Sequence, residues 1–307
     1  MKLAATLLAA LVVCAFSANA ARQIVIVTGA GGEPAYTTEF RRQAATWENA
    51  ATDEGFEVTM IADDEKSRAS LESTLRSLPH DGDDLWIVLL GHGTFDGRNA
   101  KFNLAGDDLS AGDLGSWLKS FNRRVVVLAL FSASGTFVPE LSGPNRIILA
   151  ATRSGGERNY ARLGEKFPDS LASETADLDG DGHASLLELA LHATDAVTRL
   201  YEDDQRVLSE HAILDDNGDG LGTEVRQLRK NPADTRDGRE AGGVTFAAGG
   251  SGPAFTPEEL AERSRIEAAI SDLRTRKGDL EEEVYYRQLE GLLLEMAALY
   301  QAARQHP

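Results

Sequence analysis

Short apolar runs alternate along this chain with longer stretches whose apolar residues recur every three or four positions. The runs, at residues 23–27, 56–61, 85–90, 125–131 and 146–150, are typical of strands buried on both faces of a sheet. Between the first two runs, Phe40, Ala44, Trp47 and Ala51 have the spacing of one helix face. Strands that alternate with crossover helices predict an α/β fold with a mainly parallel sheet flanked by helices.

Two of the predicted strands end on residues that carry chemistry. The run at 85–90 is followed by Gly91-His92-Gly93, and the run at 125–131 stops on Ser132-Ala133-Ser134-Gly135. Catalytic groups and ligands collect at the carboxyl ends of the strands in an open parallel sheet. We therefore expect His92 and Ser132 to lie at the same edge. The polar, glycine-rich stretch 92–104 is predicted to be an irregular loop, and its Asp96 is the candidate to orient His92.

These strand ends resemble those of the caspase–legumain superfamily of cysteine peptidases (clan CD), and in particular its bacterial legumain-like branch. The resemblance rests on His92-Gly93, on Ser132-Ala133-Ser134-Gly135 and on the segment 150–154 after a third strand, and it covers about residues 23–223. It implies a caspase/hemoglobinase-like fold. It also implies that His92 takes the place of the catalytic histidine and Ser132 that of the catalytic cysteine.

Serine at the position of the cysteine leaves three functions open. A thiol is partly ionised and polarisable, whereas a serine hydroxyl needs an oriented base and a prepared oxyanion hole. We favour a protein that is inactive as a cysteine peptidase and acts in binding or recognition. The alternative is an active, peptidase-like hydrolase that uses Ser132 with His92, oriented by Asp96, and the amides of Gly93 and Ala133 as the oxyanion hole. The third is a calcium-dependent binding module unrelated to any enzyme.

The most specific motif in the chain is an EF-hand-like calcium loop at residues 177–188. It fits the pattern D-x-D-x-D-G-x5-E in full, with helical patterns on both sides. The ligands it predicts are Asp177, Asp179, Asp181, the carbonyl of His183, Ser185 and the bidentate Glu188. Ala184 stands where a larger aliphatic residue usually pairs with a neighbouring loop. The alternative to a calcium site is an acidic turn that holds no ion.

A second acidic loop follows at residues 215–224, but it has Arg226 where the bidentate glutamate would stand. Its candidate ligands are Asp215, Asn217, Asp219, the carbonyl of Leu221 and Glu224. Either these groups bind a second calcium ion or the segment is a solvated turn. The resemblance to bacterial legumain-like proteins implies similar acidic loops after the sheet, with ions that brace the edge of the domain.

The first twenty residues have the pattern of a signal peptide, with Lys2, an apolar run and an A-x-A cleavage site that ends at Ala20. Cleavage there predicts an exported protein, periplasmic or extracellular, without a membrane span. It also removes Cys14, the only cysteine. The net charge of −18 becomes −19 when Lys2 is lost, which disfavours nucleic acid as a partner and suits calcium.

The remaining chain divides into three predicted regions. The α/β domain with both acidic loops spans residues 21–230, a flexible linker rich in Gly and Ala spans 231–255, and a helical segment spans 256–304. Thr256, Pro257 and Glu259 are typical of a helix start, and Gly278-Asp279 predicts a break between two helices. Their apolar face predicts a hairpin or coiled coil that packs on itself, on the domain, or on a peptide or protein partner, including a second copy.

Overall fold

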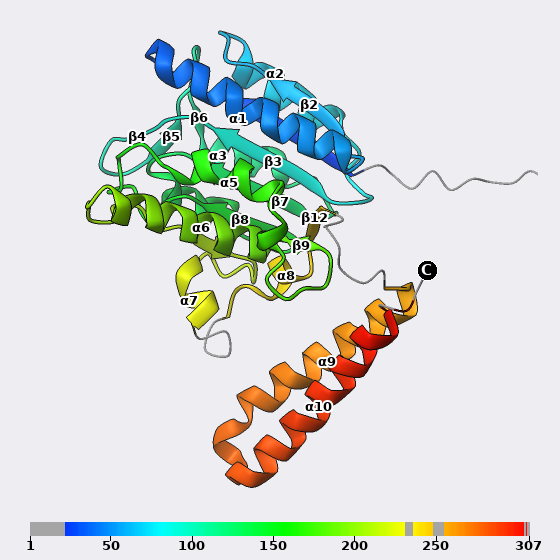
Figure 1. Cartoon of the computed structure of the whole chain (residues 1–307). Coiled ribbons are helices and arrows are strands. Elements are labelled where there is room, and N and C mark those ends of the chain that lie inside the picture. The colour runs from blue at the N-terminus through cyan, green and yellow to red at the C-terminus, as the bar shows by residue number, and fades with distance from the viewer. Residues whose placement is uncertain (1–21, 231–235, 248–254, 304, 306–307) are drawn as a thin grey trace, which may run out of the picture.

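A seven-stranded sheet forms the centre of the computed structural model, which describes residues 22–230, 236–247, 255–303 and 305 (Figure 1). The predicted signal peptide at 1–20 lies outside these residues. The strand order is β11 (Thr223–Glu224), β10 (Ile213–Asp215), β8 (Arg146–Ala150), β7 (Val125–Leu130), β3 (Leu85–Leu90), β1 (Gln23–Thr28) and β2 (Glu57–Ile61). The strands from β2 to β8 pair in parallel, whereas β10 pairs antiparallel with β8 and with β11. The sheet is therefore mainly parallel, as predicted.

Helices cover both faces of this sheet. On one face lie α1 (Pro34–Asp53), α5 (Leu163–Leu171) and α6 (Leu186–Asp203), and on the other lie α2 (Ser67–Ser77), α3 (Ala111–Leu118) and α4 (Val138–Leu141). Every residue of β1, β3 and β7 is buried. Alternate side chains of these strands enter the two separate cores, which explains why their sequences are apolar throughout.

Side chains cap the starts of two helices, one of them the start predicted at Thr256. The Ser110 hydroxyl accepts the Asp113 backbone amide at 3.1 Å in front of α3. Thr256 forms a capping box with Glu259 in front of α9 (Pro257–Thr275). Both caps satisfy backbone donors that the first helical turn leaves without a partner.

The prediction of an irregular loop over 92–104 is wrong. This segment contains β4 (Gly93–Phe95) and β5 (Ala100–Phe102), which form a small antiparallel sheet with β6 (Leu109–Ser110). The strands are so short that each places only one or two side chains towards the core, too few for an alternating pattern. Phe102 is fully buried and its ring lies 5.0 Å from that of Phe131, between centroids, so one aromatic anchor holds a hairpin whose other residues are mostly polar.

Part of the predicted linker is structured. Residues 239–242 form the short helix α8 (Arg239–Gly242), and β12 (Thr245–Ala247) pairs antiparallel with β9 (Ala184–Ser185) of the first acidic loop. Phe246 is fully buried among aromatic rings, with centroid distances of 5.4 Å to Trp47, 5.1 Å to Phe56 and 5.3 Å to Trp86. Residues 236–247 therefore belong to the α/β domain, whereas 231–235 and 248–254 lie outside the described residues.

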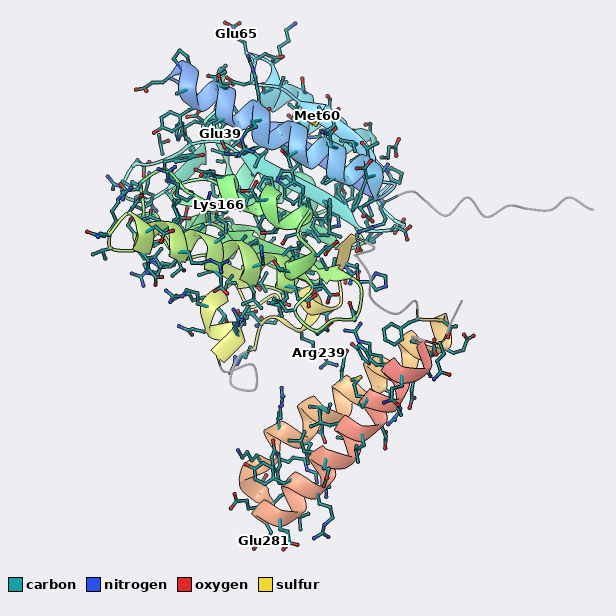
Figure 2. All side chains as sticks on the ribbon, in the orientation of Figure 1. Glu39, Met60, Glu65, Lys166, Arg239 and Glu281 are labelled. Carbon is teal, nitrogen blue, oxygen red and sulfur yellow. The ribbon has the colours of Figure 1, made fainter. Side chains whose placement is uncertain are left out.

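The C-terminal segment is a helical hairpin that extends away from the α/β domain (Figure 1). It consists of α9, the turn η3 (Lys277–Asp279) and α10 (Glu282–Ala303), and the two helices pack against each other. Glu281, at the turn, lies at the end of the hairpin that points away from the domain (Figure 2). Across the described ranges, no helix has the length and apolar character needed to span a membrane.

Candidate functional sites at the strand ends and the acidic loop

The two predicted strand ends meet, because β3 and β7 are neighbouring parallel strands in register. Gly93 lies directly on the turn that follows β7. A Cβ atom at Gly93 would come within 2.1 Å of the Ser132 carbonyl oxygen and 2.6 Å of the Phe131 ring. Only glycine fits this contact, so the main chains after His92 and before Ala133 are pressed together at the carboxyl edge of the sheet.

His92 lies among aromatic rings. Its ring centroid is 4.6 Å from that of Tyr36, 5.0 Å from that of Phe40 and 5.8 Å from that of Tyr160. Burial by these rings lowers the pKa of His92, against the opposing effects of a hydrogen bond with the Gly31 backbone and the negative charge of Glu33. A lowered pKa keeps the imidazole neutral near pH 7 and thus able to accept a proton.

Ser132 is buried, with 2% of its surface exposed, and across the described residues no hydrogen bond joins its hydroxyl to His92. Its neighbour Ala133 has a φ of 62°, in the left-handed region that disfavours residues with a Cβ atom. The Ala133 amide donates to the Glu157 carbonyl oxygen at 2.9 Å, a bond that holds this turn in place. The same bond occupies one of the two amides that were predicted to form an oxyanion hole.

Asp96 occupies a different position from the one its predicted role requires. Its side chain is exposed in the turn between β4 and β5, where one carboxylate oxygen accepts the amides of Arg98 at 2.8 Å and Asn99 at 2.7 Å. The hydrogen bond from Asn99, and then that from Arg98, lowers the pKa of Asp96. Across the described residues no hydrogen bond joins Asp96 to His92, so Asp96 stabilises a turn.

Glu157 is a residue of this edge that the sequence analysis did not single out. Its carboxylate pairs with His211 Nδ1 at 2.6 Å and with Arg153 Nε at 3.1 Å, and it accepts the backbone amides of both residues. Through its carbonyl oxygen it also holds Ala133. Glu157 thus connects the turn after β7 with the residues before β10. A single glutamate in a glycine-rich loop gives no sequence signal for such a role.

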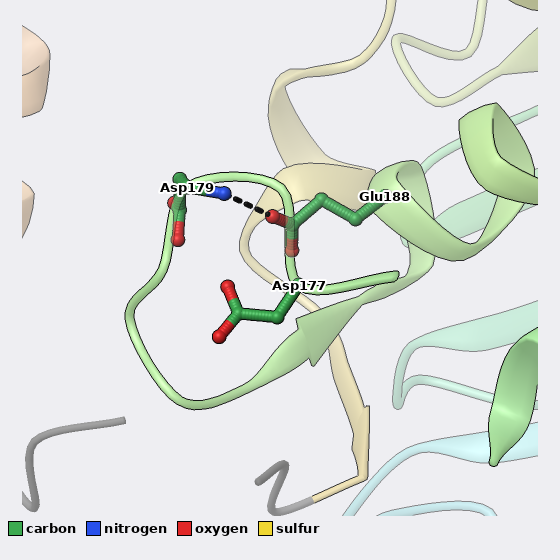
Figure 3. Close-up of side chains that lie close together, drawn as sticks. All are labelled: Asp177, Asp179 and Glu188. Carbon is green, nitrogen blue, oxygen red and sulfur yellow. Dashed lines mark hydrogen bonds between the residues drawn. The ribbon is translucent and has the colours of Figure 1, made fainter. Parts of the chain in front are cut away.

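The first acidic loop brings three of its predicted ligands together (Figure 3). Carboxylate oxygens of Asp177, Asp179 and Glu188 lie within 4.8 Å of one another. Glu188 is buried, and its two oxygens accept the amides of Asp179 at 3.1 Å and Ser185 at 2.9 Å. Asp177 accepts the amides of Gly180 at 2.7 Å and Gly182 at 2.8 Å, so backbone donors hold the loop in a compact turn around its carboxylates.

These residues fit a calcium ion. Calcium takes oxygen ligands from carboxylates, and three carboxylates from loop positions 1, 3 and 12 converge here. Partial desolvation raises the pKa of the Asp179 carboxyl to about 6, against the opposing charge of Arg263, and the nearby Glu188 and Asp177 carboxylates add to the rise. A divalent cation would relieve this repulsion between like charges.

The remaining predicted positions of the loop are arranged differently. Asp181 lies outside the three-carboxylate cluster, and its carboxylate accepts the His183 amide at 2.7 Å. The Ser185 hydroxyl donates to Glu188 at 2.7 Å and caps α6. Ala184 pairs with Ala247 of β12, so the partner of this loop is a strand from the predicted linker.

Backbone amides of the second acidic loop also donate hydrogen bonds to side chains of the same loop. Asp215 accepts the amides of Gly218 at 3.0 Å and Gly220 at 2.9 Å, and the side chains of Asn217 and Asp219 each accept the amide two residues further on. Leu221 is exposed, and Glu224 lies on β11. In the described part of the chain, the only convergent acidic group of three or more is the one in the first loop.

Comparisons with known proteins give a distant structural similarity. No family model matches the chain, and no curated protein matches it. Among solved structures, caspase-1 from Spodoptera frugiperda is similar to this chain, with 12% sequence identity, a TM-score of 0.39, and coverage of 57% of this chain and 76% of that one. At this identity and TM-score the similarity carries no conclusion about this chain, so function has to be inferred from the site residues themselves.

Proposed function

We propose that this chain is an exported calcium-binding protein with a caspase–legumain-like α/β domain, inactive as a cysteine peptidase, that acts by binding a peptide or protein. The pairing of the strands supports a caspase–legumain-like domain, because His92 and Ser132 follow neighbouring parallel strands as the resemblance implies. The convergence of Asp177, Asp179 and Glu188 supports the calcium site.

The observation that carries the proposed inactivity is the bond between the Ala133 amide and the Glu157 carbonyl oxygen, at 2.9 Å. A serine nucleophile needs donors that point at the developing oxyanion, and removal of one such donor typically costs about 100- to 1000-fold in rate. Here that donor is occupied within the protein. A serine hydroxyl ionises far less readily than a thiol and needs a base in contact with it, and among the described residues no hydrogen bond joins the Ser132 hydroxyl to His92.

The rival function is a serine hydrolase that uses Ser132 with His92. The lowered pKa of His92 favours it, because a neutral imidazole is the form that acts as a base. Labelling with a serine-directed fluorophosphonate probe separates the two functions. We expect no labelling of the natural chain; labelling that is lost in Ser132→Ala would establish the hydrolase and contradict our proposal.

Calcium binding is tested by thermal unfolding with and without a chelator. An ion that binds only the native state stabilises it by about 2.7 kcal/mol when free calcium is a hundred times the dissociation constant. Chelation is therefore expected to lower the melting temperature of the natural chain, and Glu188→Ala should remove most of that response. An identical melting curve with and without chelator would contradict the calcium site.

A further inference from the structure

One side chain of the helical hairpin reaches into the first acidic loop. Arg263, on the second turn of α9, donates from Nη2 to the Asp179 carboxylate at 2.6 Å, and its Nη1 forms an ion pair with Asp181. Its Nε pairs with Glu267 on the same helix at 2.8 Å. Only 13% of the Arg263 side chain is exposed. The guanidinium is thus enclosed by three carboxylates, two of which belong to the loop.

Asp179 and Asp181 stand at positions 3 and 5 of the calcium pattern, and calcium would use the same carboxylates. Asp181 illustrates the conflict. Its carboxylate pairs with Arg263 and lies outside the cluster formed by Asp177, Asp179 and Glu188. For an ion to gain all the acidic ligands of the pattern, Asp181 has to turn away from Arg263 and towards the cluster.

We propose that the Arg263 guanidinium and calcium compete for Asp179 and Asp181, so that calcium binding releases the helical hairpin from the domain. This inference rests on the proposed calcium site. The hairpin in turn acts as an internal ligand that lowers the apparent calcium affinity of the loop, because the two binding events are thermodynamically linked and each weakens the other. Release would free the hairpin for the peptide or protein partner proposed above.

The contacts that attach the hairpin to the domain are suited to release by calcium. Within the described elements, α9 and α10 pack chiefly on each other and on the turn between them, and Figure 1 shows the hairpin projecting from the domain. In the described chain, the ion pairs of Arg263 are the salt bridges that join the hairpin to the loop. A calcium ion can displace the guanidinium from these carboxylates because it carries twice the charge.

Calcium titration calorimetry on the full chain, on Arg263→Ala and on Arg265→Ala tests the competition. Arg265 is a matched control, since it lies on the same helix but pairs with Glu262 and Glu295 of the hairpin. We expect Arg263→Ala to bind calcium more tightly than the natural chain, within the range of about 5- to 150-fold that is typical of coupled sites. Arg265→Ala should bind like the natural chain.

The outcomes separate this inference from the proposed function. Equal affinities in all three proteins would overturn the competition and leave the calcium site intact. Binding by none of them would overturn the calcium site and the competition with it.

A distance measurement tests the release of the hairpin. In a Cys14→Ser background, which contains no other cysteine, spin labels at Ala45→Cys on α1 and Gln288→Cys on α10 report the separation of hairpin and domain. We expect calcium to broaden or lengthen the distance distribution, and Arg263→Ala to show the released distribution without calcium. A distribution that calcium binding leaves unchanged would overturn the release.

Discussion

Gly93 and Ser132 are in direct main-chain contact at the carboxyl edge of the sheet, so close that a Cβ atom at Gly93 would lie 2.1 Å from the Ser132 carbonyl oxygen. The contact joins the residues that follow β3 and β7, and it places the start of β4, directly after His92, on the turn that contains Ser132. The main chain at Ser132 cannot move aside as the end of a flexible side chain can. The geometry of the predicted dyad therefore depends on the absence of a side chain at residue 93.

Gly93→Ala is expected to destabilise the domain by roughly 1 to 3 kcal/mol, the usual cost of forcing extra volume into a packed site. Gly112→Ala is the matched control: Gly112 is in α3, and the nearest atom to an added Cβ there is the Ser110 hydroxyl oxygen, at 4.0 Å. That substitution should be neutral or stabilising, because alanine favours helix over glycine by up to about 1 kcal/mol. Urea unfolding of both variants measures the difference, and equal stabilities would contradict the contact.

Ser132→Cys is expected to create a thiol whose alkylation depends on His92. A neighbouring imidazole favours the thiolate. The thiol should therefore still react with iodoacetamide at pH values too low for an ordinary thiol to react. His92→Asn in the same background should shift that profile towards the thiol's ordinary pKa of about 8.5. Ser134→Cys serves as a control, since Ser134 is buried to a similar degree but its hydroxyl lies 3.3 Å from that of Thr152, which cannot act as a base. A profile that His92→Asn leaves unchanged would show that the two residues do not form a dyad.

Glu210 gives the domain a pH dependence. This buried carboxylate accepts the amides of Arg162 at 2.6 Å and Leu163 at 2.9 Å at the start of α5, and burial raises its pKa to about 7, against the opposing effect of those hydrogen bonds. The native state thus holds a proton that the unfolded state releases near the ordinary pKa of 4.5. The contribution of Glu210 to stability is fully present below pH 4.5 and is lost as the pH rises through about 7.

Glu210→Gln should remove this dependence, which amounts to at most about 1.4 kcal/mol per pH unit. Denaturant unfolding at several pH values between 4.5 and 7.5 measures it, with the exposed Glu48→Gln on α1 as control. Parallel stability curves for the natural chain and Glu210→Gln would contradict the raised pKa.

Phe246→Ala tests whether β12 is part of the core. Phe246 is fully buried against Trp47, Phe56 and Trp86, and truncation of such an aromatic side chain typically costs about 3 to 5 kcal/mol. Val207→Ala, at a residue that is 90% exposed, should change the free energy of unfolding by less than about 0.5 kcal/mol. A flexible linker would instead give both variants the same stability.

The parts of the fold that the sequence predicted are those with long, strong patterns. The strands β1, β3 and β7 are buried on both faces, and their apolar runs show it directly. The small sheet around Phe102 and the strand β12 escaped prediction, because two- and three-residue strands in polar, glycine-rich sequence show too few positions for a period to appear.

The candidate sites were predictable only in part. The order of motifs indicated that His92 and Ser132 follow neighbouring strands, and the spacing of carboxylates indicated a common site for Asp177, Asp179 and Glu188. The contact of Arg263 with Asp179 joins residues 84 positions apart. The bond from Ala133 to Glu157 also depends on how separate loops meet in three dimensions. No local pattern encodes either contact.

The most direct test of this account is a calcium-binding isotherm for the natural chain and for Glu188→Gln. Glu188 supplies the bidentate carboxylate of the pattern, and glutamine keeps its volume while it removes the negative charge. We expect the natural chain to bind calcium and Glu188→Gln to bind at least about tenfold more weakly, the loss that 1.4 kcal/mol of binding free energy represents. Glu48→Gln, at an exposed residue of α1 outside both acidic loops, provides the control for loss of charge alone. The absence of calcium binding by the natural chain, or equal affinities for the natural chain and Glu188→Gln, would contradict the account.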